Sequence, residues 1–226
     1  RQHLESGEYP HIQNYCLMSV EGSFTDFHID LGGTSVWYHV HRGRKFFIFA
    51  EPTAENLAAY ESWSVKPKQN REYLFQIIKN CFVVKLEEGQ TMMIPTGWIH
   101  AVYTPTDSLV FGGNFLHSYA TQSQLKIYEL EIRTRVPLKY RLPFFETWHW
   151  HIASYYLRKI RKWKGSQPSE ASRREQPPVE IIPKPFVDTI SHFVGVLSTW
   201  YSDSLDDKYR EGGSSTILAA KEASAM

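Results

Sequence analysis

Between Tyr15 and His117 the chain consists of short runs of β-branched and aromatic residues, each of strand length and each ended by turn-forming residues. The turn-forming residues, or breakers, are as informative about the fold as the runs, because Gly, Pro, Asn and Asp supply the backbone conformations of tight turns. This succession predicts an antiparallel all-β barrel or sandwich. The runs are YCLMSV, DFHID, TSVWYHV, KFFIFA, FVVKL, TMMIP, IHAVYT and SLVFGGNFL, and the breakers include LGGT, HRGR, EEGQ, PTGW and PTDS.

Apolar residues at helical spacing occur in one interruption of the strands and again after them. In PTAENLAAYESWS, Thr53 is a suitable N-cap for a helix whose apolar face carries Leu57, Tyr60 and Trp63. Beyond His117, SQLKIYELEIRTR and FFETWHWHIASYYLRKIRKW also predict helices. In the second of these, the residues expected on one face are Phe145, Trp148, Ile152 and Tyr155.

These patterns predict a mainly β fold with added helices. The segment GSQPSEASRREQPP is polar and Pro-rich, which is typical of a linker, and an amphipathic helix is expected after Pro185. The expected organisation is an N-terminal extension (1–14), a barrel core (15–120), a helical part (121–164), a linker (165–178), a last helix (179–210) and a tail (211–226).

The charge and hydrophobicity of the sequence limit the classes of partner that we expect this chain to bind. The 226 residues include 25 Lys plus Arg and 24 Asp plus Glu, so a net charge of +1 provides no global field toward nucleic acid or an anionic membrane. No apolar run approaches the roughly 20 residues that cross a bilayer, so no membrane association is expected. Both cysteines, Cys16 and Cys81, stand in apolar stretches, which favours buried thiols and a reducing compartment.

One pattern of chemistry-bearing residues predicts a metal site. His28 and Asp30 are two residues apart in a strand-like run, so their side chains share a face, and His100 follows on a distant strand. Two His and one carboxylate that leave positions open are the donor set of non-haem Fe(II) oxygenases. The pair His39 and His41 has metal-ligand spacing too, and points outward if Tyr38, on the opposite face of that strand, faces the interior.

Long contiguous motifs carry a family resemblance. The stretch from Tyr15 to Tyr140 resembles JmjC histone lysine demethylases, above all the lysine-specific demethylase 2 branch, with the PHD-finger JmjC demethylases next. The resemblance implies a cupin-type double-stranded β-helix, a jelly-roll barrel, followed by helices. The motifs are SVEGSFTDFHIDLGGTSVWYHV, GQTMMIPTGWIHAVYTPTDSLVFGGNFLHS and QLKIYELEIRTRVPLKYRLPFFE.

The resemblance also assigns roles to residues of this chain. It implies that Lys45, which alternates with Phe47 and Phe49, enters an aromatic interior, where a buried ammonium needs an anionic partner such as a 2-oxoglutarate carboxylate. Asn114 resembles the family's polar residue near the metal. Gly112 and Gly113 are expected either to let the backbone approach the methylated lysine closely or to mark a bulge. The implied set is Fe(II) on His28, Asp30 and His100, and 2-oxoglutarate on Thr25, Lys45, Tyr38 and Asn114.

The activity implied by the resemblance is oxidative demethylation of methyl-lysine on histone H3, with Fe(II), 2-oxoglutarate and O2. Mono- or dimethylated lysine 36 is the site expected for the demethylase 2 branch. The implied location is the nucleus and the partner is the H3 tail or nucleosome, with weak DNA contact through Arg158–Lys164. A JmjC protein hydroxylase and a catalytically silent chromatin-binding JmjC module are the alternatives.

Overall fold

The computed structural model describes residues 10–67, 72–165 and 184–205, and it divides into two compact units, Arg1–Pro143 and Phe144–Met226. In chain order the elements are β1 (Tyr15–Ser19), β2 (Phe24–His28), the 3-10 turn η1 (Leu31–Gly33), β3 (Ser35–Ala50), α2 (Ala54–Ser64), η3 (Leu74–Gln76), β4 (Phe82–Glu87), β5 (Thr91–Ile94), β6 (Ile99–Phe115), η4 (Ser118–Ala120), α3 (Thr121–Arg133), η5 (Leu138–Tyr140), α4 (Phe145–Gly165) and α5 (Lys184–Leu205).

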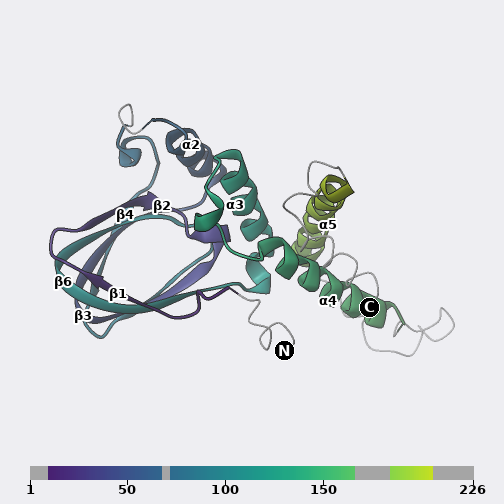
Figure 1. Ribbon diagram of the computed structural model, residues 1–226, viewed down its shortest axis with the longest axis horizontal. Coiled ribbons are helices and arrows are strands. Elements are labelled where there is room, and N and C mark those ends of the chain that lie inside the picture. The colour runs from purple at the N-terminus through teal and green to yellow at the C-terminus, as the bar shows by residue number, and fades with distance from the viewer. Residues whose placement is uncertain (1–9, 68–71, 166–183, 206–226) are drawn as a thin grey trace. The chain divides into compact units, whose positions relative to one another are not determined.

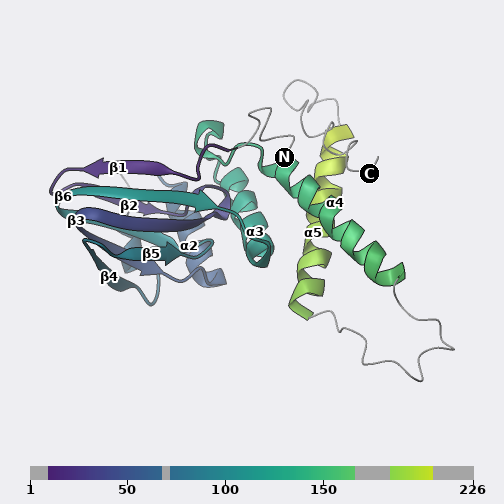
Figure 2. The ribbon, with the colours of Figure 1, turned by 90° about the horizontal axis from the view of Figure 1, so that it is seen from below.

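The first unit is built on two long antiparallel strands, β3 and β6, which pair from Ser35 opposite Phe115 to Ala50 opposite Ile99. β1 and β2 pair with different halves of β6, and β5 and β4 pair with different halves of β3. Figure 1 shows these strands curving around a common interior, and Figure 2 shows their succession from β1 to β4. The predicted fold class, mainly β with a jelly-roll barrel and added helices, is confirmed.

The predicted breaks at HRGR and PTDS were wrong, because each lies inside one continuous strand. β3 joins two predicted strands and β6 joins two others. Their pairing register shifts repeatedly between Val40 and Phe46, where Gly43 adopts a φ of 84°. A Cβ on Gly43 would lie 2.2 Å from the backbone oxygen of Asp107, so only glycine allows this approach. These turn-type residues bend the two strands through bulges instead of ending them.

The interior of the barrel is apolar and aromatic. Phe47 is fully buried, stacks on Phe49 with 5.4 Å between ring centroids, and meets Tyr38 edge to face at 5.0 Å. Alternate residues of the same strands therefore face inward, as the two-residue period of a strand requires. The buried cluster comprises Val36, Tyr38, Val40, Phe47, Phe49, Leu86, Ile94, Val102 and Val110.

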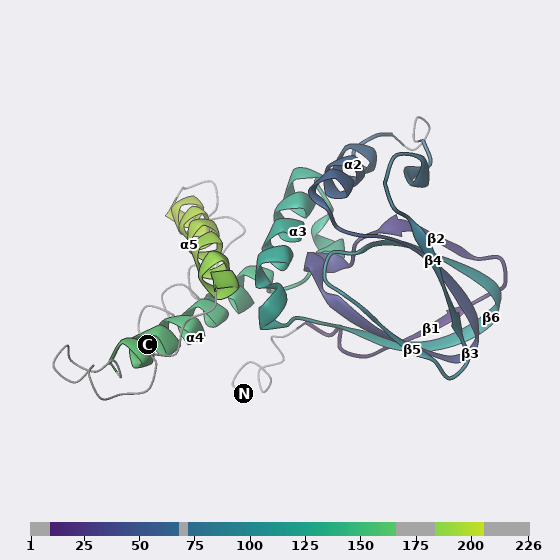
Figure 3. The same ribbon diagram turned by 180° about the vertical axis from the view of Figure 1, so that it is seen from behind.

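Helix α2 contributes to a second apolar cluster. Thr53 caps the helix, its side chain accepting a hydrogen bond from the Asn56 N–H, as predicted. Leu57 and Tyr60 pack against this cluster and Trp63 is buried within it, so the predicted apolar face is confirmed. Figures 1 and 3 show α2 and α3 together at one end of the strands. The buried members of the cluster are Phe27, Ala50, Trp63, Leu74, Ile78, Ile99 and Ala101.

The second unit pairs α4 with α5 through aromatic contacts. His149 is fully buried, stacks on Phe145 at 4.0 Å, and meets the rings of Phe193 and Trp200 edge to face. Phe145 is buried as predicted, but Tyr155 is exposed, so that part of the predicted face was wrong. The buried face follows the contacts that α5 supplies, which the spacing within α4 alone did not reveal.

The expectation of buried thiols was also wrong, since Cys16 and Cys81 are both exposed and free. Cys16 lies on β1 opposite Phe111, whereas its neighbour Tyr15 lies on the face that turns inward. The predicted linker after Gly165 and the predicted tail from residue 211 lie outside the described residues. Among the helices that the structure describes, none has the length and apolar character to cross a membrane.

Candidate metal centre

His28, Asp30 and His100 meet at one end of the paired strands β2 and β6. His28 is opposite His100 in the strand register, and their ring centroids lie 4.2 Å apart. Asp30 follows two residues after His28, and its Oδ2 lies 3.8 Å from Nε2 of His100. One ligand atom from each residue lies within 4.8 Å of the others, which is a separation that one metal ion can bridge.

Backbone carbonyls orient both imidazoles. Nδ1 of His28 lies 2.9 Å from the oxygen of Asp26, and Nδ1 of His100 lies 3.1 Å from the oxygen of Trp98. A carbonyl oxygen only accepts hydrogen bonds, so each Nδ1 carries the proton in these contacts. Each Nε2 therefore keeps its lone pair available for a metal, and the carbonyl fixes the ring orientation.

The charge state of His100 also suits a ligand. The residue is 3% exposed, and this burial lowers its pKa to about 4 against the opposing influence of the Asp30 carboxylate. His100 is consequently neutral near pH 7, the form that coordinates metals. Two imidazoles and one carboxylate fit a divalent non-haem iron better than a closed zinc site.

Asn114 stands beside the carboxylate of the triad. Its Nδ2 donates to Thr34 Oγ1 at 2.8 Å and makes a longer contact of 3.5 Å with Asp30 Oδ1. The backbone N–H of Asn114 donates to the oxygen of Ile12 at 2.7 Å. The side-chain amide is thus held mainly by Thr34, beside the Asp30 carboxylate.

Lys45 is buried on the interior face of β3, as predicted. Only 2% of it is exposed, and its ammonium donates to Thr104 Oγ1 at 2.7 Å. Burial lowers its pKa to about 8. Within the part of the chain that the structure describes, no carboxylate pairs with it. Phe47, the next residue on this face, has its ring centroid 6.1 Å from that of His100. An uncompensated ammonium facing the same interior as a metal triad is suited to bind an anion.

Tyr38 and Thr25 differ in their surroundings. Tyr38 is 6% exposed and faces the interior, where burial raises its pKa. Thr25 pairs with Val102, which places its side chain on the same face of the sheet as His100, but it is exposed. The hydrogen bond of Lys45 goes instead to Thr104, a residue that the sequence did not single out.

The rival pair does not form a metal site. Tyr38 faces inward, so His39 and His41 point to the other side of β3. Nδ1 of His39 is hydrogen-bonded to Thr91 Oγ1 at 2.8 Å, and His41 is exposed. Among the described His, Cys, Asp and Glu side chains, only the group at His28, Asp30 and His100 converges in this way.

Tyr15 was missed by the sequence reasoning. It pairs with Gly112, and burial, followed by the nearby charge of Asp30 and by Tyr38, raises its pKa. A Cβ on Gly112 would lie 2.4 Å from the Tyr15 ring, so the glycine provides the space that the ring occupies. Alternation in the run YCLMSV was the available signal, but the inward face depends on pairing with β6.

Gly113, which follows Gly112, allows a close contact within this chain. A Cβ on Gly113 would lie 1.7 Å from the backbone oxygen of Gln13. The space beside Gly113 is therefore filled by the backbone of this chain and is not open to a substrate lysine. The first expectation for Gly113, a close approach to the methylated lysine, was wrong.

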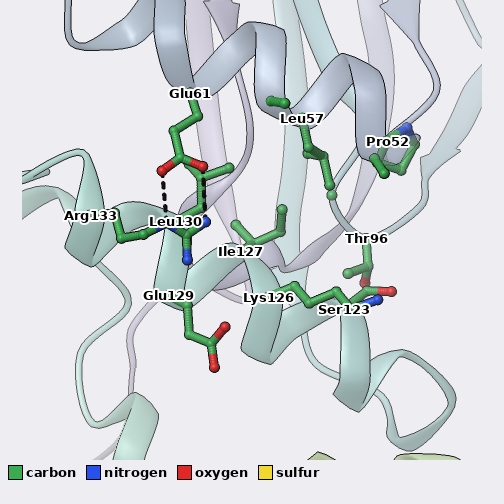
Figure 4. A pocket seen from close by; sticks show the side chains of 13 residues that line it. Pro52, Leu57, Glu61, Thr96, Ser123, Lys126, Ile127, Glu129, Leu130 and Arg133 are labelled. Atoms are coloured by element: carbon green, nitrogen blue, oxygen red, sulfur yellow. Dashed lines mark hydrogen bonds and ion pairs between the residues drawn. The ribbon is translucent and has the colours of Figure 1, made fainter.

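A separate pocket of about 390 Å³ lies between α2 and α3. Figure 4 shows its apolar side chains, among them Leu57, Ile127 and Leu130, and the ion pair of Arg133 with Glu61 at 2.7 and 2.9 Å. None of the residues discussed above for metal or 2-oxoglutarate lines it.

Comparisons with known proteins agree with this geometry. Residues 15–115 match the family model described as "JmjC domain, hydroxylase", and residues 120–181 match "Jumonji helical domain". The chain is 54% identical over 154 residues to lysine-specific demethylase 2B of Mus musculus, covering 68% of the chain and 12% of that protein. It is 51% identical over 154 residues to lysine-specific demethylase 2A of Xenopus tropicalis, covering 68% and 13%.

A third relative comes from another branch. Lysine-specific demethylase 7A of Danio rerio is 46% identical over 158 residues, covering 70% of the chain and 18% of that protein. The chain thus spans less than a fifth of the length of each of these relatives. The matched segments contain all three residues of the metal triad and helix α3. The chain belongs to the JmjC-domain family.

Proposed function

We propose that this chain is the catalytic part of an Fe(II)- and 2-oxoglutarate-dependent dioxygenase that demethylates methyl-lysine on histone H3, at mono- or dimethylated lysine 36. The observation that carries the proposal is the convergence of His28, Asp30 and His100 beside an interior that also holds the buried ammonium of Lys45. A metal triad alone fits many metals. A buried cation facing the same interior adds a site for the carboxylate of a co-substrate.

Each residue has a defined part in this proposal. His28, Asp30 and His100 hold Fe(II) through two Nε2 atoms and one carboxylate, and leave positions for ligands. Lys45 binds the distal carboxylate of 2-oxoglutarate, with Tyr38 and Thr25 as hydroxyl donors. Asn114 holds the Asp30 carboxylate in place. The residues thus bind and orient the co-substrate, which is the protein's share in cofactor chemistry.

The chemistry that iron supplies, when bound, is O2 activation coupled to oxidation of 2-oxoglutarate to succinate and CO2, with one oxygen atom inserted into an N-methyl C–H bond. The hydroxymethyl amine then releases formaldehyde, which leaves lysine with one methyl group fewer. Tyr38, Phe47 and Phe49 line the interior with aromatic surface. Such surface excludes water, which protects a reactive centre from side reactions.

A histone lysine substrate is proposed from the names of the relatives, which are lysine-specific demethylases and, at 48% identity over 159 residues, the JmjC domain-containing histone demethylation protein 1 of Caenorhabditis briggsae. Lysine 36 of H3 is proposed from the resemblance to the demethylase 2 branch. A histone substrate places the protein in the nucleus, with the H3 tail or nucleosome as its partner. Exposed cations on α4 are proposed to contact DNA phosphates weakly. They are Arg158, Lys159, Arg161 and Lys162.

Mass spectrometry of methylated H3 peptides tests the proposal. With Fe(II), ascorbate and 2-oxoglutarate, a peptide carrying dimethylated lysine 36 is expected to lose about 14 Da per methyl group removed. The His100→Ala variant should give no product. The His41→Ala variant, altered on the outward face of β3, should match the unmodified protein.

Three results would contradict the proposal. A gain of about 16 Da in place of the loss would indicate a hydroxylase. Loss of methyl groups from peptides modified elsewhere, but not at lysine 36, would overturn the proposed site. No change with any peptide would reject demethylation by this chain.

A further inference from the structure

The backbone immediately after Asp30 forms an unusual tight turn. Gly32 has φ 57° and ψ 20°, and Gly33 has φ 60°, so two consecutive residues occupy the left-handed region. Gly33 N–H donates to the oxygen of Asp30 at 2.9 Å, and Thr34 N–H donates to the oxygen of Leu31 at 3.1 Å. This turn, η1, begins directly after Asp30 and fixes the direction of the backbone there. The position of the Asp30 carboxylate therefore depends on the conformation of η1.

Glu131, at a distance of 99 residues in sequence, contacts the middle of this turn. Its Oε1 accepts a hydrogen bond from the Gly32 N–H at 2.7 Å, a length typical of a charge-assisted hydrogen bond. Both residues are buried, and Glu131 is only 6% exposed. The N–H of Gly32 therefore depends on this carboxylate for its hydrogen bond.

The placement of Glu131 is costly for stability. Its second oxygen, Oε2, is buried without a hydrogen-bond partner, and burial raises the pKa of the carboxyl to about 7 against the opposing influence of the Gly32 N–H and the Arg141 charge. A buried carboxyl that satisfies only one oxygen is a poor way to stabilise a helix packing face. A role toward the turn explains its presence better.

Helix α3 supports the turn by direct packing as well. A Cβ on Gly33 would lie 3.0 Å from Cβ of Ile127 and 3.3 Å from Cα of Gln124, so the turn lies as close to α3 as glycine permits. Ile127 is buried here and its side chain also lines the pocket between α2 and α3 (Figure 4). The helix thus fixes the turn from one side with a hydrogen bond and a tight apolar contact.

We propose that Glu131 is a positioning residue of the metal centre, which holds the η1 turn through Gly32 and so keeps the Asp30 carboxylate in line with His28 and His100. Glu131 lies in the segment that matches the Jumonji helical domain, whereas the triad lies in the segment that matches the JmjC domain. The helical segment thereby completes a metal centre built by the barrel. This inference rests on the metal centre of the proposed function.

Cobalt titration of the intact chain tests the inference without turnover. Co²⁺ binding is followed by visible absorption for the wild type and for Glu131→Ala, Glu131→Gln and Glu129→Ala. Loss of a residue that orients a ligand weakens metal binding by about 10- to 100-fold, so Glu131→Ala should fall in that range. Glu131→Gln keeps an oxygen acceptor for Gly32 and should bind within about threefold of the wild type. Glu129→Ala, on the same helix, should bind like the wild type.

Thermal unfolding without metal separates positioning from stability. A Glu131→Ala protein that is folded and binds Co²⁺ as the wild type does would overturn the inference, whatever its melting temperature. If Glu131→Ala does not fold, Glu131→Asp replaces it, because the shorter side chain retracts from Gly32. Weaker Co²⁺ binding by folded Glu131→Asp supports the inference, and unchanged binding overturns it. A wild type that binds no Co²⁺, or a His100→Ala variant that binds it equally, instead rejects the metal centre itself.

Discussion

Replacing Lys45 with Met should stabilise the protein in the absence of ligands. A pKa lowered by burial from 10.5 to about 8 corresponds to about 3 kcal/mol, at about 1.4 kcal/mol for each tenfold change in the protonation equilibrium. Met removes this cost of burying charge. It also removes the hydrogen bond to Thr104, which contributes about 1 kcal/mol. The expected net gain in the free energy of unfolding at pH 7 is therefore about 2 kcal/mol.

The pH dependence of this gain identifies its cause. Below pH 8 the ammonium is charged in both the folded and the unfolded chain, so the folded state bears the full cost. Between pH 8 and 10.5 the folded chain loses the proton first and the cost declines. The gain from Lys45→Met should therefore be largest near pH 7 and shrink by more than half by about pH 9.5.

Urea unfolding followed by tryptophan fluorescence measures the effect at both pH values. Lys85→Met is the matched control, because Lys85 lies on β4 with its side chain about half exposed to solvent and paired with Glu87. That variant should stay within about 0.5 kcal/mol of the wild type. A Lys45→Met protein that is less stable at pH 7, or whose gain does not change with pH, would refute the reasoning.

The same variant tests the proposed role of Lys45 in binding. With Mn²⁺ in place of iron, 2-oxoglutarate should raise the melting temperature of the wild type, because a ligand that binds the folded state stabilises it. Lys45→Met should lose that shift. An equal shift in both proteins would place the 2-oxoglutarate site elsewhere.

Three further predictions follow from local structure. Thr53→Ala should lower the free energy of unfolding by about 1 kcal/mol in urea titrations, because it removes the α2 cap, and an unchanged midpoint would contradict the capping role. Gly113→Ala should lower the free energy of unfolding by about 1–3 kcal/mol, because the added Cβ would collide with the Gln13 backbone. Gly195→Ala in α5 places its Cβ in open space and should raise the free energy of unfolding by up to about 1 kcal/mol. Equal effects of the two substitutions would reject the close-approach argument. Replacing Arg158, Lys159, Arg161 and Lys162 together should weaken DNA binding and flatten its salt dependence, measured by fluorescence anisotropy, and an unchanged slope would exclude this face.

Local sequence patterns predicted which of several candidate site residues share a strand face. Period-two alternation placed Lys45 with Phe47 and Phe49, and Tyr38 opposite His39 and His41, and both placements match the structure. Alternation works here because successive side chains of a strand must point to opposite faces. The choice between faces, however, came from the resemblance and not from the spacing.

Burial was predicted less accurately for residues that are covered, or left exposed, by segments far away in the sequence. Cys16 looked buried because its run is apolar, yet β1 turns Tyr15 inward and Cys16 outward. His149 and Glu131 gave no signal at all, because their burial arises from α5 in one case and from the η1 turn in the other. Periodicity within one element cannot identify the element that covers it.

The sequence by itself determined the strand-rich class and the helix capped at Thr53, and it predicted that His28 and Asp30 share a strand face as candidate metal ligands. These depend on residue type and short spacing, which are local properties. Only the tertiary structure decided that HRGR and PTDS bend continuous strands, that Thr104 receives the Lys45 bond and that Glu131 holds the turn after Asp30. Each of these depends on strand register or on contacts between segments far apart in the chain, and such contacts exist only after the whole core has packed.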